Sequence, residues 1–504
     1  MTTPLPAIVA LARAGASRQA WRLFVAAGHD RSADPDALTL HGRLLKDQAL
    51  AATGLERAAL AAQAGAAYAA AAAARPATYP LINAATLALI AGDPAAAAAR
   101  AAEVLHLLET TPEPDTPWWQ GATRAEALLL MGDTAGAAGA LADAIAVAPL
   151  AWEDHAVTLR QFAVVIAAQG GDAGWLEAHR PPRSLHFAGS LHLDAPESDL
   201  ATRIDAIIAA ERIGFGYGAL AAGADLLIAE RLLAAGAELH VLLPGGEGAF
   251  VRESVAPWGQ EARFAAVLAR AASVRAVGDA ALPDQAPDLA MAEADQLAMG
   301  LAVMNAGALA SHPVQLVIGG AGPGQHSARL AAHWAATGRR QHVLGSLPAA
   351  QAQPASPAQL AAIIAVRPLG QPASLAAMLA LADRLPPLPD ATIAGAGDAL
   401  LLILPDPAAA ASAAMALRSR LASTGPVSLA GHYGAVITVA GQPMGPAITT
   451  ALAIAAATPD TAFYASEAFA AALNAGTLPA GIGCAPVGDL ARPGADPVPL
   501  LALD

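Results

Sequence analysis

The sequence predicts a multidomain chain with three parts: an all-α repeat solenoid, an α/β domain with a parallel sheet, and an α+β domain. The first expectation rests on apolar and small residues at helical spacing, from residue 1 to about 180. The second rests on strands that alternate with helices after Pro181 and Pro182. The third rests on a β-α-β-β-α-β order in the last part.

The length of 504 residues agrees with three parts, at roughly 150 residues per domain. We expect the domains at 1–180, 183–345 and 361–504. Residues 346–360 are rich in Pro, Ala, Gln and Ser and are predicted to be a linker.

Composition narrows the classes of partner. The net charge of −14 argues against general nucleic-acid binding, which needs a basic surface. No apolar run reaches the roughly 20 residues of a membrane helix, and Arg13 and Arg18 interrupt the segment that a signal peptide would need. One cysteine, Cys484, excludes a disulfide framework within the chain and a cysteine-based zinc site. We therefore expect a cytoplasmic protein without nucleic-acid or membrane partners.

The helical part contains the same Gly-Asp turn motif at two positions. Gly92-Asp93 and Gly132-Asp133 each follow an apolar helix and precede an Ala-rich helix, whose small residues allow a neighbouring helix to approach closely. This pattern predicts a tetratricopeptide-like solenoid, in which each repeat buries its apolar face only against its neighbours. The alternative is an Ala-rich helical bundle without true repeats.

Longer motifs give this part a family resemblance. "HGRLLKDQA", "YPLINAATL" and "WWQGATRAEALLLMGD" resemble the TRAFs-binding region of the apoptosis signal-regulating kinases and of its bacterial relatives. The resemblance implies a docking scaffold whose partner is a protein. Arg43, Lys46 and Asp47 are interpreted as a structural salt-bridge cluster in preference to a ligand site.

The middle part is predicted from "GFGYGALAAGADLLIAERLLAAGAELHVLLPGG". A glycine-rich turn leads into a helix from about Ala224 to Ala235, and a buried strand follows, which is the order that builds a parallel sheet. Gly216, Gly218 and Gly223 would allow close backbone approach. The helix start at Gly223-Ala224-Asp225 would favour an anion such as phosphate.

The same stretch resembles the SMF/DprA–LOG superfamily of Rossmann-like domains over about 183–345. That resemblance implies a nucleotide or nucleotide-derived ligand. The sequence indicates no other cofactor with certainty, and we expect no metal. The expected ligand-binding residues are Gly189, Gly216, Gly218, Gly223, Ala224, Asp225, Gly245, Gly246 and Glu247. The loop 319–327, with His326, could face the same crevice.

This domain could alternatively be an enzyme. LOG enzymes cleave an N-glycosidic bond with a "PGGxGTxxE" motif, and this chain has "PGGEGAFVRE", where Glu253 lies one residue beyond the family's glutamate. An N-glycosidase therefore remains an alternative, as does an α/β domain that retains no ligand.

The last part is predicted to be ferredoxin-like. "GDALLLIL", "GHYGAV", "GPAITTALAIA" and "AFYASEAF" resemble the class III adenylate/guanylate cyclase domain over about 361–504. The family's reaction needs two carboxylates that bridge two divalent cations, together with an asparagine and an arginine for the transition state.

Most of that set is replaced. Val366 or Arg367 stands at the first aspartate position, Thr449 at the asparagine and Ala453 at the arginine, and the domain has no lysine. Only Asp398 remains, as a relic metal position on a hairpin turn, where we expect it to satisfy backbone N–H groups. We therefore expect no metal site and no catalytic residue here.

Together these features predict a non-catalytic cytoplasmic signalling scaffold with a nucleotide-sensing middle domain and a pseudo-cyclase domain that forms a homodimer. Two alternatives remain open: a nucleotide-processing enzyme that uses the middle domain, and a cyclase active only with an intact partner.

Overall fold

A computed structural model of the chain describes residues 3–13, 17–110, 116–278, 287–320, 325–351, 358–369, 388, 390–421, 427–459, 462–492 and 495–503. The chain divides into two compact units. The first comprises Met1–Pro181 and Ala308–Ser311, and the second comprises Pro182–Gly307 and His312–Asp504.

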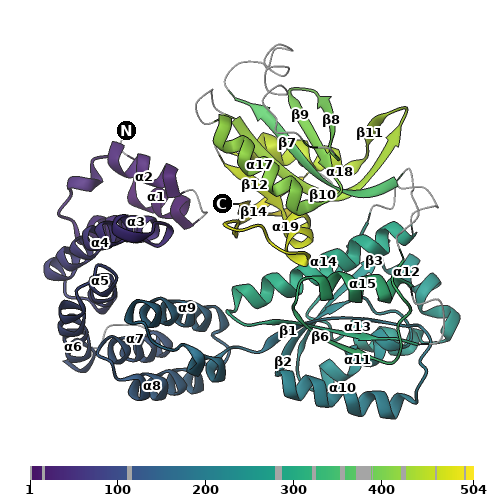
Figure 1. Cartoon of the computed structure of the whole chain (residues 1–504), viewed down its shortest axis with the longest axis horizontal. Coiled ribbons are helices and arrows are strands. Elements are labelled where there is room, and N and C mark those ends of the chain that lie inside the picture. Colours follow the sequence, from purple (N-terminus) through teal and green to yellow (C-terminus); the bar gives the residue numbers. More distant parts are fainter. Residues whose placement is uncertain are drawn as a thin grey trace. The chain divides into compact units, whose positions relative to one another are not determined.

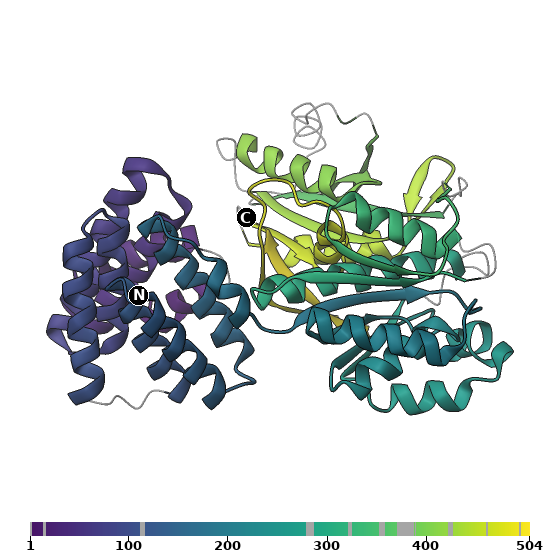
Figure 2. The same cartoon turned by 60° about the horizontal axis from the view of Figure 1, so that its bottom comes forward.

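The first unit is helical, as the sequence predicts, and consecutive helices pack side by side (Figures 1 and 2). Its elements are α1 (Leu5–Arg13), α2 (Ser17–Ala26), η1 (His29–Arg31), α3 (Pro35–Ala51), α4 (Gly54–Ala74), α5 (Thr78–Ile90), α6 (Pro94–Thr110), α7 (Pro117–Leu130), α8 (Thr134–Val147), α9 (Trp152–Gln169) and η2 (Gly174–His179).

The two Gly-Asp corners have the same geometry. Gly92 and Gly132 adopt positive φ, at 92° and 84°, which ends α5 and α7 in the manner of a glycine C-cap. Asp93 then accepts a hydrogen bond from the N–H of Ala96, and Asp133 from that of Gly136, so that each aspartate caps the next helix. The repeated motif thus specifies a repeated helix–turn–helix corner.

The second unit begins with a six-stranded parallel sheet in the order β4-β3-β2-β1-β5-β6. Its strands are β1 (Arg183–Gly189), β2 (Ile213–Gly218), β3 (Glu238–Pro244), β4 (Ser273–Val277), β5 (Pro313–Ile318) and β6 (Arg340–Leu344). Its helices are α10 (Glu197–Glu211), α11 (Ala224–Ala234), α12 (Glu247–Ser254), η3 (Ala256–Trp258), α13 (Glu261–Leu268), α14 (Pro287–Ala308) and α15 (Gln325–Ala336).

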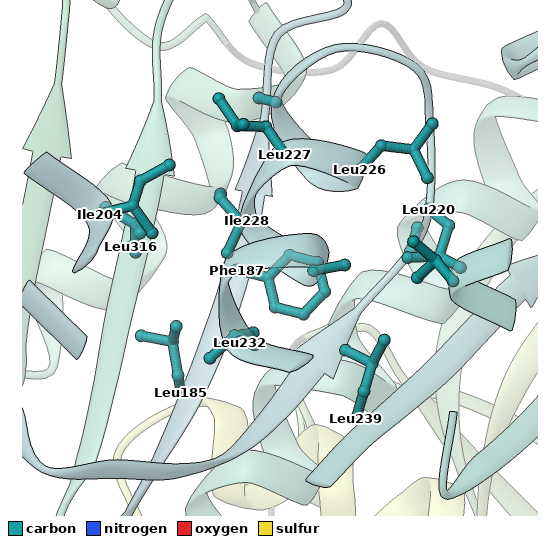
Figure 3. Close-up of a cluster of buried hydrophobic side chains, with 14 of the residues drawn as sticks. Leu185, Phe187, Ile204, Leu220, Leu226, Leu227, Ile228, Leu232, Leu239 and Leu316 are labelled. Carbon is teal, nitrogen blue, oxygen red and sulfur yellow. The ribbon is translucent and has the colours of Figure 1, made fainter. Parts of the chain in front are cut away.

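Helices cover both faces of this sheet (Figure 1). On one face α10, α11 and α13 bury Leu185 and Phe187 of β1, and Figure 3 shows Phe187 among Leu220, Ile228 and Leu232. On the other face Ala188 packs with residues of α14 and α15. Burial on both faces explains the consecutive apolar residues of β3, Val241–Leu243, and of β5, Leu316–Ile318.

A second sheet is mostly antiparallel, in the order β13-β14-β12-β10-β7-β9-β8, with β11 paired to β10. The strands are β7 (Ala358–Pro368), β8 (Thr392–Ala396), β9 (Ala399–Leu404), β10 (Val427–Val439), β11 (Gln442–Met444), β12 (Phe463–Ser466), β13 (Cys484–Arg492) and β14 (Ala495–Leu503). The helices are α17 (Pro407–Leu421), α18 (Pro446–Ala457) and α19 (Glu467–Ala475).

This sheet is also covered on both faces. Ile364 of β7 packs in one core with residues of α17 and α19, and its neighbour Ile363 packs in the other core with residues of α18. Strand β7 begins at Ala358, inside the predicted linker. The segment "SLAAMLALADRL", residues 374–385, also predicts a helix, but it lies outside the described residues.

The structure therefore consists of a helical region followed by mixed α/β sheets. The narrower descriptions, Rossmann-like and ferredoxin-like, stay predictions, as does the division into three domains. In the described part of the chain, no helix combines the length and apolarity required to span a bilayer.

Candidate functional site

The strand order of the parallel sheet points to one location. From β1 the chain builds outward through β2, β3 and β4, and then returns to place β5 on the other side of β1. Gly189, the last residue of β1, pairs with Ile318, the last residue of β5. Ligands of open α/β sheets bind beyond the carboxyl ends of the strands at such a reversal.

Helix α11 starts at this edge. Gly223 has φ of 80°, and a Cβ there would lie 2.5 Å from the carbonyl oxygen of Leu191. The N–H of Ala224 donates to the carbonyl of Ser190 at 3.1 Å, and that of Gly223 to Oε1 of Gln260 at 3.4 Å. The sequence predicts that these two N–H groups bind a phosphate. In the structure both donate to acceptors within the protein.

Asp225, in the first turn of α11, is 6% exposed. Its Oδ2 accepts from the N–H of Ala221 at 3.3 Å. Its Oδ1 is buried without a hydrogen-bond partner among the described residues. Burial, followed by the nearby charge of Asp295, raises the pKa of Asp225 to about 8.

Asp295 and His326 complete a cluster from three helices. Asp295 lies on α14 and is buried, and its Oδ2 is 2.6 Å from Nε2 of His326 on α15. The His326 side chain is 41% exposed, so the pair extends from the surface to the buried Asp295. Burial acts to lower the pKa of His326, but Asp295 outweighs it and raises that pKa.

The expected glycines of β2 have packing roles. A Cβ at Gly216 would lie 2.5 Å from Cδ1 of Leu232 on α11, and one at Gly218 would lie 2.6 Å from the carbonyl oxygen of Phe187 on β1. Close approach of helix to strand, and of strand to strand, therefore accounts for these two glycines. At the end of β1, a Cβ at Gly189 would likewise meet the side chain of Ala224.

The remaining expected residues follow β3. Gly245 and Gly246 adopt positive φ, and the N–H of Gly245 donates to the carbonyl of Val277 on β4. Glu247 and Glu253 are both exposed on α12. No contact among the described residues joins either glutamate to the Asp225 cluster.

The sequence did not single out Asp295. A signal was present, because "ADQLAMGLAVM" places an acid at the start of a long apolar helical run. That signal could not identify the partner of Asp295, since His326 lies on another helix, α15, and the two side chains meet only in the folded chain.

In the second sheet, Asp398 is held by an arginine. It follows Gly397 in the turn between β8 and β9, and its Oδ2 accepts from Nε of Arg367 at 2.6 Å. Arg367 lies near the end of β7, where Val366 pairs with Leu400 of β9. This hydrogen bond differs from the expected bonding of Asp398 to backbone N–H groups.

Thr449 and Ala453 lie one turn apart on α18, where Thr449 is exposed and Ala453 is half-buried. Neither offers the charge or the amide that the cyclase transition state needs. Among the described residues, no group of three or more histidine, cysteine or acidic side chains is arranged to hold a metal ion.

The first unit contains a polar network around Lys46, the one lysine of the chain. Its Nζ donates to Oδ1 of Asn83 at 2.8 Å and to Oε1 of Gln161 at 3.2 Å. Glu126 accepts from Thr86 at 2.6 Å and from Gln161 at 2.8 Å. The network joins α3, α5, α7 and α9, in keeping with a structural role for Lys46.

The family comparison concerns this helical region. Residues 7–88 match the family model described as Tetratricopeptide Repeats-Sensor. The N-terminal part of the helical region is thus tetratricopeptide-like, while the two Gly-Asp corners lie beyond the matched residues. The match spans less than half of the chain, and no protein of curated function matches the sequence.

Solved structures give weaker similarities. The adenylyl cyclase CyaB from P. aeruginosa is 15% identical, with a TM-score of 0.22, over 29% of this chain and 94% of that one. An adenylate/guanylate cyclase/hydrolase from Silicibacter pomeroyi is 17% identical, with a TM-score of 0.25, over 29% and 96%.

An O-GlcNAc transferase mutant from Thermobaculum terrenum is 10% identical, with a TM-score of 0.19, over 57% of this chain and 52% of its own. This chain thus spans about half of that transferase. TM-scores this low do not establish a shared fold or a shared activity.

Proposed function

We propose that this protein is a non-catalytic signalling scaffold, with a middle region that senses a nucleotide-type ligand and a C-terminal cyclase-like region without cyclase activity. The proposal that the C-terminal region lacks cyclase activity rests on the bond between Arg367 and Asp398. It places a guanidinium on the one acid that remains of the cyclase metal set.

Two-metal catalysis needs negative charge at this position. Two carboxylates must hold two divalent cations, which activate the attacking hydroxyl and neutralise the triphosphate. Here Arg367 brings a permanent positive charge to the carboxylate, and repels the cation that Asp398 would bind. A homodimer does not supply the missing acid, because both copies carry the same residues.

The test is a cyclase assay on the full chain with ATP or GTP and Mn²⁺. We expect no cyclic nucleotide above background. The variant Asp398→Ala is compared with Asp390→Ala, a control that removes an exposed acid elsewhere in the second unit. Cyclic product that Asp398→Ala abolishes and Asp390→Ala leaves intact would overturn the proposal.

The sensor half is supported by the cluster of Asp225, Asp295 and His326 at the reversal of strand order. Buried carboxyl groups with perturbed pKa values gather at functional sites more than elsewhere. Isothermal titration calorimetry of the full chain with ATP, GTP, AMP and GMP tests nucleotide binding. If none of the four nucleotides binds, the proposal of a nucleotide sensor is wrong.

In the proposed scaffold, the helical region binds a protein partner and the C-terminal region forms a homodimer. It is supported by the match of residues 7–88 to a tetratricopeptide family, since repeats of this kind present extended binding surfaces. Light scattering of the purified chain tests the homodimer, and a monomer at all concentrations would remove that part of the proposal.

A further inference from the structure

We propose that Arg43 and Lys46 of α3, together with Tyr79 of α5, form an acid-docking surface, at which an acidic side chain of the protein partner binds. This inference rests on the scaffold function proposed above and deepens it. It states where on the helical region the partner is held, and by which chemistry.

The first support is that two cations of α3 lack a bonded anion. The sequence is interpreted as a salt-bridge cluster of Arg43, Lys46 and Asp47, but among the described residues none of the three takes part in an ion pair. Burial raises the pKa of Asp47 more than the two cations lower it, which weakens Asp47 as a countercharge. A carboxylate from outside the chain would form charge-assisted hydrogen bonds with both cations.

The second support is the way in which Lys46 is held. Its Nζ donates to two uncharged groups, Oδ1 of Asn83 at 2.8 Å and Oε1 of Gln161 at 3.2 Å. An ammonium group has three N–H donors, so one of them has no acceptor among the described residues. Burial lowers the pKa of Lys46 more than the neighbouring acids raise it, so a further anion would stabilise the charged amine.

The order of the helices brings Tyr79 level with Arg43. Short turns join α3 to α4 and α4 to α5, and each pair packs side by side, so α3 and α5 run in the same direction. The bond between Lys46 and Asn83 fixes the register of the two helices. About one turn earlier lies Arg43 on α3 and Tyr79 on α5.

The ring of Tyr68, on α4, links the same two helices. A Cβ at Gly42 of α3 would lie 2.6 Å from this ring, and the ring centroid is 6.1 Å from that of Tyr79. Tyr79 itself is 51% exposed. An exposed tyrosine that is held by packing and lies near an unpaired arginine is the composition that protein interfaces favour.

Charge and exposed area together favour an acidic segment of a protein over a free inorganic anion. The two cations of α3 supply the N–H donors that a carboxylate needs. The exposed tyrosine ring offers contact area that an inorganic anion would leave unused, whereas the neighbouring residues of a peptide can pack on it. The helical region therefore presents both parts of a peptide-docking surface.

The experiment is phage display of a random peptide library on the full chain, followed by fluorescence anisotropy with the synthetic selected peptides. We expect the selected sequences to contain Asp or Glu. Their counterparts with Asn or Gln in place of the acids should bind at least about tenfold more weakly, because a hydrogen bond between two charged groups is lost.

Arg43→Gln should weaken the acidic peptides by a similar factor. The matched control is Arg100→Gln on α6, since Arg100 is also half-buried and without an ion pair in the described part of the chain. It should leave binding unchanged. The amide peptides should bind the natural protein and Arg43→Gln equally, because the acid and the arginine act as a pair, and full additivity of the two changes would overturn the contact.

A second readout separates docking from folding. Because Arg43 forms no ion pair among the described residues, Arg43→Gln should leave the melting temperature of the chain unchanged. A clearly lower melting temperature would mean that Arg43 serves the fold, and the acid-docking surface would be wrong.

The display distinguishes the two proposals. Selected peptides without acids, or acidic peptides that Arg43→Gln does not affect, overturn the acid-docking surface and leave the scaffold in place. If no peptide is enriched over the support without protein, both the acid-docking surface and the protein-docking role of the helical region are wrong.

Discussion

Asp225 is an acid whose side chain gains little from folding. It loses water on burial, and in return its carboxyl group gains the N–H of Ala221, at Oδ2, and the nearby N–H of Gly189. A charged group that is costly to bury is expected at functional sites, where stability is given up for binding. Arg367 and Asp398 are different, because an exposed ion pair contributes only about 0–1 kcal/mol to stability.

The raised pKa of Asp225 predicts a pH dependence of stability. Its folded value of about 8 lies above the ordinary 3.8, so the folded state holds a proton that the unfolded state releases. The carboxyl group therefore destabilises the fold increasingly as pH rises from about 4 to about 8, and the effect is constant above that.

Asp225→Asn removes this titration. We expect the variant to exceed the natural protein in free energy of unfolding by at least about 1 kcal/mol at pH 8, and by much less at pH 4. Urea unfolding at several pH values measures this difference. A difference that does not change with pH would contradict the assignment.

Helix α19 illustrates how one element links the two sheets of the second unit. The backbone of Ala471 lies against Gly300 of α14, where no side chain would fit. The guanidinium of Arg339 donates to the carbonyls of Ala475 and Gly476 at 3.0 and 2.9 Å, and so satisfies the carboxyl end of the helix. At the other end, Glu467 forms an ion pair with Arg275.

This contact predicts a sharp position effect along α14. Gly300→Leu should lower the free energy of unfolding by about 1–3 kcal/mol, because the side chain would overlap the backbone of α19. Gly307→Ala, on the same helix with no atom within 4 Å of the new Cβ, should be neutral or stabilising. Chemical denaturation measures both, and equal effects of the two substitutions would contradict the packing.

Helices α14 and α15 also carry Asp295 and His326, besides Gly300 and Trp334. Trp334 is buried and packs with Ala475 of α19. The candidate ligand cluster and the contact with α19 therefore share the same two helices.

On the scale of the whole molecule, the chain forms two compact units, each with its own buried core. The first is held by neighbouring helices that approach closely, as where a Cβ at Gly121 would lie 2.8 Å from Cβ of Ala144. The second is held by two sheets, each covered by helices.

Two units predict two cooperative transitions in calorimetry. Gly121→Leu should lower the temperature of one transition only, and Gly300→Leu that of the other only, since each substitution overpacks a different unit. Gly139→Ala, a control in α8 with open space around the new Cβ, should shift neither downward. A single transition that moves with both leucine variants would contradict two separate units.

Much of the element order could be read from the sequence, because its signals are local. At Gly92 and Gly132, two adjacent residues specify the turn and the cap of the next helix. The helix from Ala224 begins where the glycine-rich turn predicts it. Strand β7 begins at Ala358, ahead of the domain start predicted at 361, because its first residues pair with β10 across the sheet, which no local pattern reveals.

The candidate site was only half predictable. The glycine-rich turn marks Asp225, whereas no motif marks Asp295 within its apolar helix. The loop motif indicates His326, but not its contact with Asp295. Gly216 and Gly218 attracted attention as ligand contacts, and the fold uses them for packing between elements.

The sequence alone specifies features that depend on neighbours along the chain: helix spacing, glycine turns, helix caps and apolar strand segments. The bond between Arg367 and Asp398 and the contact between Asp295 and His326 arise only in the folded chain. The physical reason is that charge, burial and hydrogen bonding depend on distances in space, and strand order brings together residues that the sequence keeps far apart.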